Sequence, residues 1–227
     1  MGADPAAPST CRHPAIGEKD TTLLAREGDA YATRHNPFVY FHSIIDSPTC
    51  ADHVVDLGVL ATDLAATATT PHLSFIVPDL CSDAHDATCA DGSEGGLPQA
   101  DRWLREWVPR ILAAPAFLEG GLLIITFDEA ATGGDTADSS ACCGEGAVPN
   151  LSGPAGRDGP GGGRVGAVVL GPAVAPGTVS DTAYHHYSLL CSLEHLWGLE
   201  LLGYAGHPET PCFAGDVYTA DPEYAAS

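Results

Sequence analysis

The chain has 227 residues and a hydrophobic fraction of 44%, which is enough for one domain with a buried core. Its 30 acidic residues stand against 9 basic ones, so the formal net charge is -21. A charge of this sign and size disfavours binding to nucleic acid and to anionic membrane surfaces. It leaves two interpretations open, a highly soluble surface or sites for cations.

The eight cysteines form neither a CxxC pair nor a spacing typical of zinc fingers. This pattern favours disulfides, and therefore an oxidising compartment, over structural zinc. Two local pairs are the first candidates, Cys81 with Cys89 and Cys191 with Cys212. No stretch approaches the roughly 20 apolar residues of a membrane-spanning helix.

The N-terminal residues lack the basic and apolar regions of a signal peptide. Disulfides without such a peptide lead us to expect that the chain starts at an internal Met of a longer protein. That longer protein is expected outside the cell or in the cell envelope.

The first half of the chain predicts two helices and one strand after a coil over residues 1–20. A short helix is expected over 20–33. Apolar residues at helical spacing predict an amphipathic helix over 51–66, with Asp52 as its N-cap. A short apolar run predicts a buried strand over 73–77. Acids and one imidazole follow this strand directly, at Asp79, Asp83, His85 and Asp86.

A basic pair, Arg34 and His35, precedes an aromatic stretch that begins after Pro37. Two interpretations are open for this segment. It is either a plain loop that enters a short extended or helical piece, or a place where His35 lies near an anion.

Residues 98–112 place their apolar side chains on one face and predict a helix, which Pro109 is expected to kink near its end. The apolar run 122–127 predicts a strand that is covered on both faces, as in a parallel sheet. Asp128 and Glu129 come directly after it.

Strand 73–77, helix 98–112 and strand 122–127 follow one another in βαβ order. Such a crossover is expected to be right-handed, with the carboxyl ends of both strands at one edge of the sheet. The acids that follow the two strands should therefore converge where open α/β sheets bind ligands.

Residues 130–163 form a Gly-rich loop of the length found in functional lids or disordered segments. Its run of three glycines is only weak evidence for phosphate binding. A strand over 164–171 and a helix over 184–198 complete the pattern, with His186 near the helix start. Without a repeat or a second domain signal, residues 1–227 predict a single domain.

The candidate ligands are Asp, Glu and His side chains at strand ends or at a helix start. Such mixed sets suit hard or borderline divalent metals, which can stabilise both oxygens of a phosphoryl transfer. The plainer alternative is that acids gather in the loops of any chain with so many of them. The set comprises Asp79, Asp83, His85, Asp86, Asp128, Glu129 and His186.

Several short segments occur in an order that resembles a known family. They are Arg-His-Asn-Pro-Phe (34–38), Phe-Ile-Val-Pro-Asp (75–79) with His-Asp (85–86), Ile-Ile-Thr-Phe-Asp-Glu (124–129), Gly-Gly-Gly-Arg-Val (161–165), and His-Tyr-Ser-Leu-Leu (186–190) with Trp-Gly-Leu (197–199). Together they resemble the C-terminal half of the phosphoesterase family, which contains bacterial secreted acid phosphatases and phospholipases C. The resemblance runs from about residue 30 to residue 203.

The resemblance implies an α/β fold like that of alkaline phosphatase, with a mostly parallel sheet and helices on both faces. It also implies a site built from metal-binding acids and from histidines around the phosphate or the metal. The implied metal ligands are Asp128, Glu129, Asp79, Asp83 and Asp86, and the implied catalytic histidines are His35, His85 and His186.

Family members also carry a Glu-Asn metal-binding pair and a Ser or Thr nucleophile in their first third, and this chain has no Glu-Asn pair. We therefore expect the N-terminal strands and the nucleophile-bearing half to be absent from it. The first expectation is a metal-dependent acid phosphatase that acts through a phosphoenzyme, with Ca, Mn, Zn or Mg. The alternatives are phospholipase C-type cleavage of a phospholipid, or an inactive secreted cation-binding module.

Overall fold

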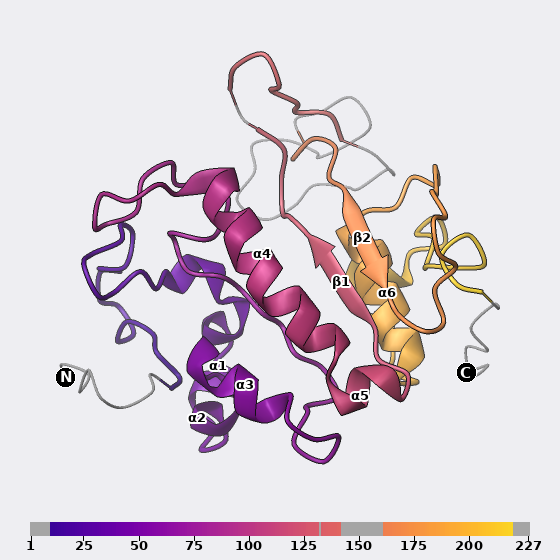
Figure 1. The fold of residues 1–227 in the computed structure, drawn as a ribbon, viewed down its shortest axis with the longest axis horizontal. Coiled ribbons are helices and arrows are strands. Elements are labelled where there is room, and N and C mark those ends of the chain that lie inside the picture. Colours follow the sequence, from indigo (N-terminus) through magenta and orange to yellow (C-terminus); the bar gives the residue numbers. More distant parts are fainter. Residues whose placement is uncertain (1–9, 132, 142–160, 220–227) are drawn as a thin grey trace. The chain divides into compact units, whose positions relative to one another are not determined.

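The computed structural model describes residues 10–131, 133–141 and 161–219. The chain forms two compact units, Met1–Glu119 and Gly120–Ser227, which are described separately. Helices and a small sheet make it a mixed α/β structure (Figure 1). The predicted single-domain organisation stays a prediction.

The first unit is built from short helices and one long one. The short ones come first: η1 (Thr33–His35), η2 (Pro37–Tyr40), α1 (His42–Ile45), α2 (Cys50–His53), η3 (Leu57–Val59) and α3 (Leu60–Asp63). They are followed by α4 (Gly96–Leu112) and α5 (Pro115–Leu118).

Helix α4 confirms the helix predicted over 98–112 and begins slightly earlier, at Gly96. Its apolar face buries Trp107, whose ring centroid lies 6.2 Å from that of Trp103. The helix continues past Pro109 to Leu112, so the missing N–H of the proline falls in its last turn.

The predicted helix over 51–66 is wrong, because the chain divides there into α2, η3 and α3. The main-chain N–H of Cys11 donates to the Val54 carbonyl at 2.7 Å, which holds this part of the backbone extended. The side chain of Asp56 then accepts from Gly58 N and starts a new turn. Asp52 lies inside α2 and is not an N-cap.

The predicted helix over 20–33 is also wrong. Arg26 and Asp29 exchange main-chain hydrogen bonds in a tight turn, at 2.8 and 2.9 Å, with Gly28 at a φ of 75°. A turn of this kind interrupts any helical ladder, and glycine supplies its left-handed conformation without strain.

Residues 73–77 have no strand partner among the residues that the structure describes, so the buried strand predicted there is wrong. Three side chains that should be covered are instead exposed, with 53% of Leu73, 61% of Phe75 and 39% of Val77 accessible. An apolar run supplies a strand's composition but not the neighbour that its main-chain groups need. The predicted βαβ unit is therefore not formed in the described structure.

The second unit contains β1 (Leu123–Thr126) and β2 (Ala167–Leu170), side by side in Figure 1. These strands confirm the positions predicted at 122–127 and 164–171. They pair antiparallel, with Leu123 opposite Leu170 and Thr126 opposite Ala167. The described part of the chain thus shows a small antiparallel sheet where a mostly parallel one was predicted.

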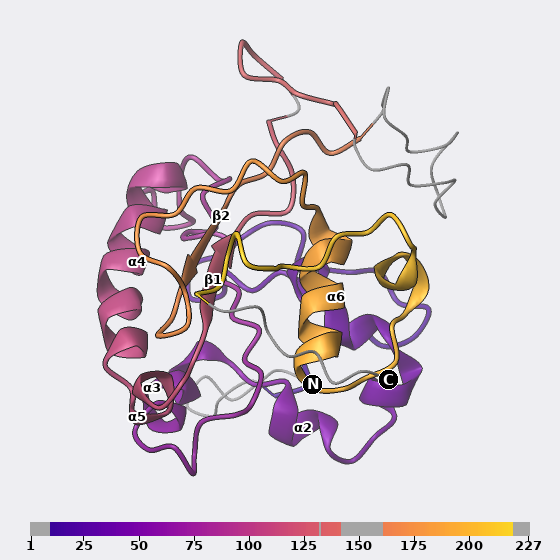
Figure 2. The same ribbon diagram turned by 90° about the vertical axis from the view of Figure 1, so that its right-hand side faces the viewer.

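Helix α6 (His186–Leu196) confirms the helix predicted over 184–198. It packs against η4 (Gly203–Gly206), which lies beside it in the yellow C-terminal part of Figure 2.

Three disulfides lie within the described residues, Cys11–Cys50, Cys81–Cys89 and Cys191–Cys212. The two local pairs expected from the sequence are confirmed. The bond between Cys11 and Cys50 explains the extended backbone at Val54, because it joins the N-terminal segment to the start of α2. Among the described helices, none has the length and apolar character that crossing a bilayer requires.

Candidate functional site

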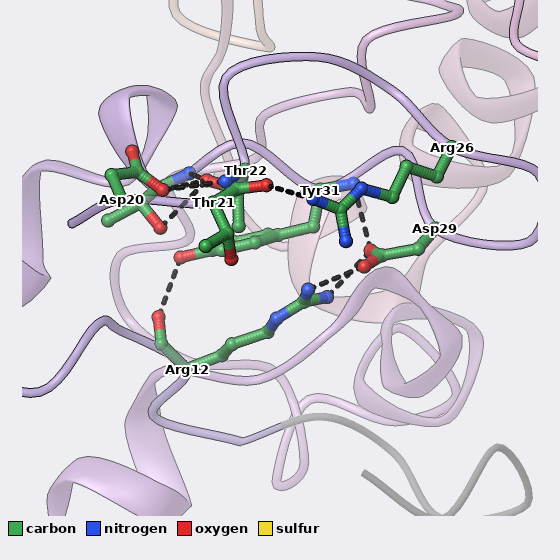
Figure 3. Close-up of polar contacts among 8 residues, drawn as sticks. Arg12, Asp20, Thr21, Thr22, Arg26, Asp29 and Tyr31 are labelled. Atoms are coloured by element: carbon green, nitrogen blue, oxygen red, sulfur yellow. Dashed lines mark hydrogen bonds and ion pairs between the residues drawn. The ribbon is translucent and has the colours of Figure 1, made fainter. Parts of the chain in front are cut away.

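His35 is the last residue of η1 and is half-buried. A polar network in the preceding segment supports it (Figure 3). The Arg12 guanidinium donates to both carboxylate oxygens of Asp29, at 2.7 and 2.6 Å, and lowers the pKa of Asp29. The hydroxyl of Tyr31 donates to the Arg12 carbonyl at 2.8 Å and accepts from the Asn36 amide at 3.3 Å. The network therefore ends on the residue next to His35.

A second group of contacts in Figure 3 fixes the start of η1. The N–H and hydroxyl of Thr22 both lie 2.7 Å from one carboxylate oxygen of Asp20, and they lower the pKa of Asp20. Thr33 N donates to the Thr22 hydroxyl at 2.8 Å. The segment before His35 is thus held by side chains, which explains why it is ordered without being a helix.

Asp79 stabilises the turn where the extended segment enters the loop closed by Cys81–Cys89. One of its carboxylate oxygens accepts from Cys81 N and Ser82 N, both at 3.1 Å. This oxygen has a local structural role, which sequence alone did not separate from metal binding.

Three of the predicted site residues come together in this loop, Asp83, His85 and Asp86. One ligand atom from each lies within 4.8 Å of the others. Asp83 Oδ1 accepts from His85 N at 2.9 Å and from Asp86 N at 3.2 Å. His85 Nδ1 lies 2.8 Å from Asp86 Oδ1, and this hydrogen bond raises the pKa of His85.

The second carboxylate oxygen of Asp83 is buried and has no hydrogen-bond partner in the described structure. A buried acceptor without a donor costs about 1–3 kcal/mol, and more when it is charged. A cation would remove this cost. Two carboxylates and an imidazole suit a borderline divalent ion such as Mn²⁺ or Zn²⁺. The residues present therefore fit a metal.

Gly95 holds this loop close to the start of α4. Its N–H donates to the Ala87 carbonyl at 3.1 Å, and a Cβ at this position would lie 2.2 Å from the Asp86 carbonyl oxygen. Only glycine permits this approach, so the backbone beneath Asp86 depends on it.

In the second unit, Asp128 and Glu129 follow β1 and are exposed. His186 Nε2 lies 2.7 Å from the Asp128 carbonyl oxygen. A carbonyl only accepts, so Nε2 carries the hydrogen and the neutral ring keeps its lone pair on Nδ1. Metal-binding histidines commonly donate their other ring N–H to a carbonyl in this way. The contact places the imidazole at the end of β1, where Asp128 and Glu129 follow in the chain.

The first turn of α6 determines where His186 lies. His185 is the N-cap residue, and its N–H donates to the Ser188 hydroxyl at 3.1 Å while its side chain accepts from Ser188 N. Ser188 is fully buried. This capping box fixes the direction in which α6 begins.

A cavity of about 200 Å³ lies beside Glu129. Asp138 is at its wall, and the main-chain N–H groups of Ser140 at 2.8 Å and Arg164 at 2.9 Å point at this carboxylate. They lower the pKa of Asp138 to about 2. Small residues line most of the cavity: Ala130, Ala131, Ala137, Ser139, Gly161 and Gly162.

The glycine run of the predicted loop is required by close backbone contact at this cavity. Ala130 N donates to the Gly162 carbonyl at 2.7 Å. Gly163 has a φ of 76°, and a Cβ there would lie 2.4 Å from the Asp138 carbonyl oxygen. This packing explains the glycines without a bound phosphate. Residues 142–160 of the predicted loop lie outside the described residues.

Comparison with known proteins gives the evolutionary context of these residues. The model of the phosphoesterase family matches residues 15–200, which is most of the chain. The chain belongs to the phosphoesterase family. The resemblance noted in the sequence is thereby confirmed at the level of the family.

Individual phosphoesterases are 28% or 29% identical to the chain over the aligned residues. It is 28% identical to an acid phosphatase of Aspergillus fumigatus over 176 residues, which is 76% of the chain and 32% of that protein. It is 29% identical to a phosphate-repressible acid phosphatase of Penicillium chrysogenum, with 76% and 34% covered. It is 28% identical to a phosphatidylinositol-3-phosphatase of Mycobacterium tuberculosis, with 77% and 44% covered.

The chain spans about a third of the length of the first of these relatives. No solved structure matches it.

Within the phosphoesterase chain, Asp83, His85 and Asp86 form one side-chain cluster in the first unit. In the second unit, His186 contacts the main-chain carbonyl of Asp128, and Glu129 is the next residue. Asp79 and His35 lie outside the cluster of the first unit. The convergence of the two groups, and the role of each residue, stay predictions.

Sequence reasoning did not single out Asp138 or Asp216, which organise the backbone around the second group. A usable signal for Asp216 was the alternation of hydroxyl residues at 180, 182 and 184, which suits a shared acceptor.

Proposed function

We propose that the chain acts in the hydrolysis of phosphoric esters as a metal-dependent acid phosphatase with monoester substrates. The observation that carries this proposal is the contact of His186 with the Asp128 carbonyl. It places the ring at the turn after β1, in which Asp128 and Glu129 follow one another, and leaves Nδ1 out of this hydrogen bond. Membership of the phosphoesterase family and the relatives named acid phosphatase support the choice of reaction.

Asp128 and Glu129 are proposed as metal ligands, and Asp83 and Asp86 as acidic ligands in the first unit. The buried Oδ2 of Asp83 supports this role, because burying a carboxylate oxygen that has no hydrogen-bond donor is unfavourable unless a cation binds it. Asp79 is also proposed as an acidic ligand, but only through its second oxygen, since the first accepts a hydrogen bond from Cys81 N in a turn. A divalent ion, when bound, would polarise the phosphate oxygens and offset their charge.

Three histidines are proposed to stabilise the phosphate and to move protons. Without a bound ion, the hydrogen bond to Asp86 raises the pKa of His85 and favours the charged ring at acidic pH, whereas binding an ion would use the neutral ring. A charged ring can hold an anionic phosphate oxygen and can donate a proton to the leaving alkoxide. His186 and His35 are proposed for the same kind of role. No Ser or Thr of the described residues is assigned as the nucleophile. The family resemblance implies such a hydroxyl, which takes the phosphoryl group and then loses it to water.

We further propose an alkaline phosphatase-like fold with a mostly parallel sheet, which membership of the phosphoesterase family supports. An extracellular or cell-envelope location is proposed from the three disulfides.

One alternative has its own observation. The net charge of -21 favours a secreted cation-binding module without catalytic activity. Phospholipase C-type cleavage remains a further alternative through the family resemblance. Both alternatives enter the experiment below as outcomes.

The experiment compares p-nitrophenyl phosphate with phosphatidylcholine as substrates at acidic pH. Mn²⁺, Zn²⁺, Ca²⁺ or Mg²⁺ is added back after chelation, and wild type is compared with Asp128→Asn and with Asp181→Asn. Asp181 is an exposed acid in the same unit and serves as a matched charge control. We expect metal-dependent monoester hydrolysis that only Asp128→Asn abolishes. Preference for phosphatidylcholine would favour the diesterase. Metal binding with no hydrolysis of either substrate would contradict the hydrolase and leave the cation-binding module.

A further inference from the structure

Three hydroxyl residues precede α6 at alternate positions and share one carboxylate. Oδ2 of Asp216 accepts from the hydroxyls of Ser180 and Thr182, the latter at 2.7 Å. Oδ1 accepts from the hydroxyl of Tyr184 at 2.7 Å. The chain bends at Thr182, where Tyr184 N donates to the Thr182 carbonyl at 2.7 Å, so one acceptor reaches all three hydroxyls.

These hydrogen bonds persist over a wide pH range. The donors, Ser180 first among them, lower the pKa of Asp216 to about 2. Burial and the nearby carboxylate raise the pKa of Tyr184 to about 12. Near neutral pH the carboxylate is therefore ionised and accepts, and the phenol is protonated and donates.

The segment that carries Asp216 is held independently of these hydroxyls. Phe213 N donates to the Ser192 hydroxyl of α6 at 2.8 Å, and Cys212 is joined to α6 by its disulfide with Cys191. Further along, Thr219 N donates to the Ala173 carbonyl at 2.8 Å. The segment before Asp216 is thus held against α6 by a hydrogen bond and a disulfide.

The hydroxyl segment leads directly into the first turn of α6. Tyr184 is followed by the N-cap residue His185 and then by His186, whose Nε2–H reaches the Asp128 carbonyl at 2.7 Å. A displacement of Tyr184 would move the helix start, because only one residue separates it from His186. The imidazole is exposed, so few side-chain contacts hold it in place.

We propose that Asp216 is a positioning residue for His186. Its carboxylate joins the segment before α6 to the segment after α6 through three hydrogen bonds, and this fixes the main chain from which the imidazole reaches Asp128. The inference rests on the function proposed for His186. Asp216 lies beyond residues 15–200, the part that the family model matches.

The test reads the ring of His186 directly, without metal or substrate. Nitrogen NMR of the histidine side chains gives the tautomer, and the His186 signals are assigned by their loss in His186→Gln. The variants are Asp216→Ala, Asp216→Asn and Tyr184→Phe, with Asp181→Asn as a matched charge control in the same segment. Thermal unfolding of each variant is measured in parallel.

In wild type we expect the Nε2–H tautomer alone, because the hydrogen bond to Asp128 selects it. In Asp216→Ala we expect both tautomers, and a smaller effect in Tyr184→Phe, which removes a single donor. Asp181→Asn should match wild type. Asp216→Asn keeps the side-chain size, so the His186 tautomer can still be measured in it if Asp216→Ala does not fold.

A wild-type tautomer in folded Asp216→Asn and Tyr184→Phe, together with reduced thermal stability, would overturn the proposal and leave Asp216 with a purely structural role.

Hydrolysis of p-nitrophenyl phosphate gives the second readout. We expect kcat to fall by on the order of 10²-fold with little change in KM, as expected for a displaced catalytic group. Without wild-type activity the proposed function fails, whereas the NMR result still decides the positioning role.

Discussion

The imidazole of His186 donates a hydrogen bond from Nε2 to the main-chain carbonyl of Asp128 across 2.7 Å. This contact links the first residue of α6 to the turn that follows β1. It uses the main chain of Asp128 and not its carboxylate. The Glu129 carboxylate, Nδ1 of the imidazole, and the Asp128 carboxylate, whose Oδ1 also accepts from Glu129 N at 3.0 Å, are the groups that we propose bind a ligand.

Replacing His186 separates its structural from its chemical role. In His186→Gln the side-chain amide can still donate to the Asp128 carbonyl, so we expect the free energy of unfolding to fall by less than about 1.5 kcal/mol. Without the imidazole we expect kcat/KM for p-nitrophenyl phosphate to fall by about 10²–10⁴-fold. The exposed His72 provides the control, and His72→Gln should retain full activity. Equal activity of the two variants would remove His186 from the site.

The pair of His85 and Asp86 predicts a pH effect of known sign. Asp86 raises the pKa of His85 above 6.5, so the stabilisation is complete below about that pH and is lost as the pH rises through the folded-state value. Because the ring is exposed, we expect a contribution of only roughly a few tenths of a kcal/mol. Proton NMR titration should show that Asp86→Asn lowers the pKa of His85. An unchanged titration would show that the pair does not form in solution.

The partnerless oxygen of Asp83 predicts a local cation site in the first unit. We expect low concentrations of Mn²⁺ to broaden the NMR signals of His85, because the ion would lie within reach of its ring. Asp83→Asn should abolish the broadening. Asp91→Asn, a change to an exposed acid in the same part of the chain, should preserve it. Equal broadening in both variants would indicate diffuse attraction to the acidic surface.

Gly163 predicts a stability effect that depends on backbone geometry. Its φ of 76° and the 2.4 Å separation between an added Cβ and the Asp138 carbonyl oxygen make Gly163→Ala unfavourable by about 1–3 kcal/mol. At Gly133 an added Cβ meets nothing within 4 Å, so Gly133→Ala should change stability by less than about 0.5 kcal/mol. Urea denaturation measures both values. Similar values for the two variants would contradict the close contact at Gly163.

Local sequence patterns correctly predicted those helices and strands whose structure is determined by the residues of the segment itself. The helix over 98–112 and the strand before Asp128 are found because periodicity and apolar length are properties of the segment itself. The helix predicted over 51–66 has the same kind of pattern and fails. The disulfide from Cys11 and the hydrogen bond to Val54, which lie far away in sequence, override it.

The candidate site was predictable in part for the same reason. The chemistry of Asp83, His85 and Asp86 is visible in the sequence, and so is that of Asp128 and His186. The burial of the second Asp83 oxygen and the hydrogen bond of His186 to the distant Asp128 carbonyl depend on the folded chain, and no residue pattern contains them. Strand 73–77 fails because pairing requires a neighbour that the pattern cannot supply.

The most direct test of the proposed metal centre is calorimetric titration of Mn²⁺ into wild type, Asp128→Asn and the matched control Asp181→Asn. Wild type should bind Mn²⁺ at a tight site formed by Asp128, Glu129 and His186. Asp128→Asn should weaken this binding by more than about tenfold, because mutating residues that only hydrogen-bond to metal ligands already lowers metal affinity by about that factor. Asp181→Asn should bind as wild type does. Equal binding by all three proteins would show that the net charge of -21 attracts the ion without a defined centre, and would contradict the account.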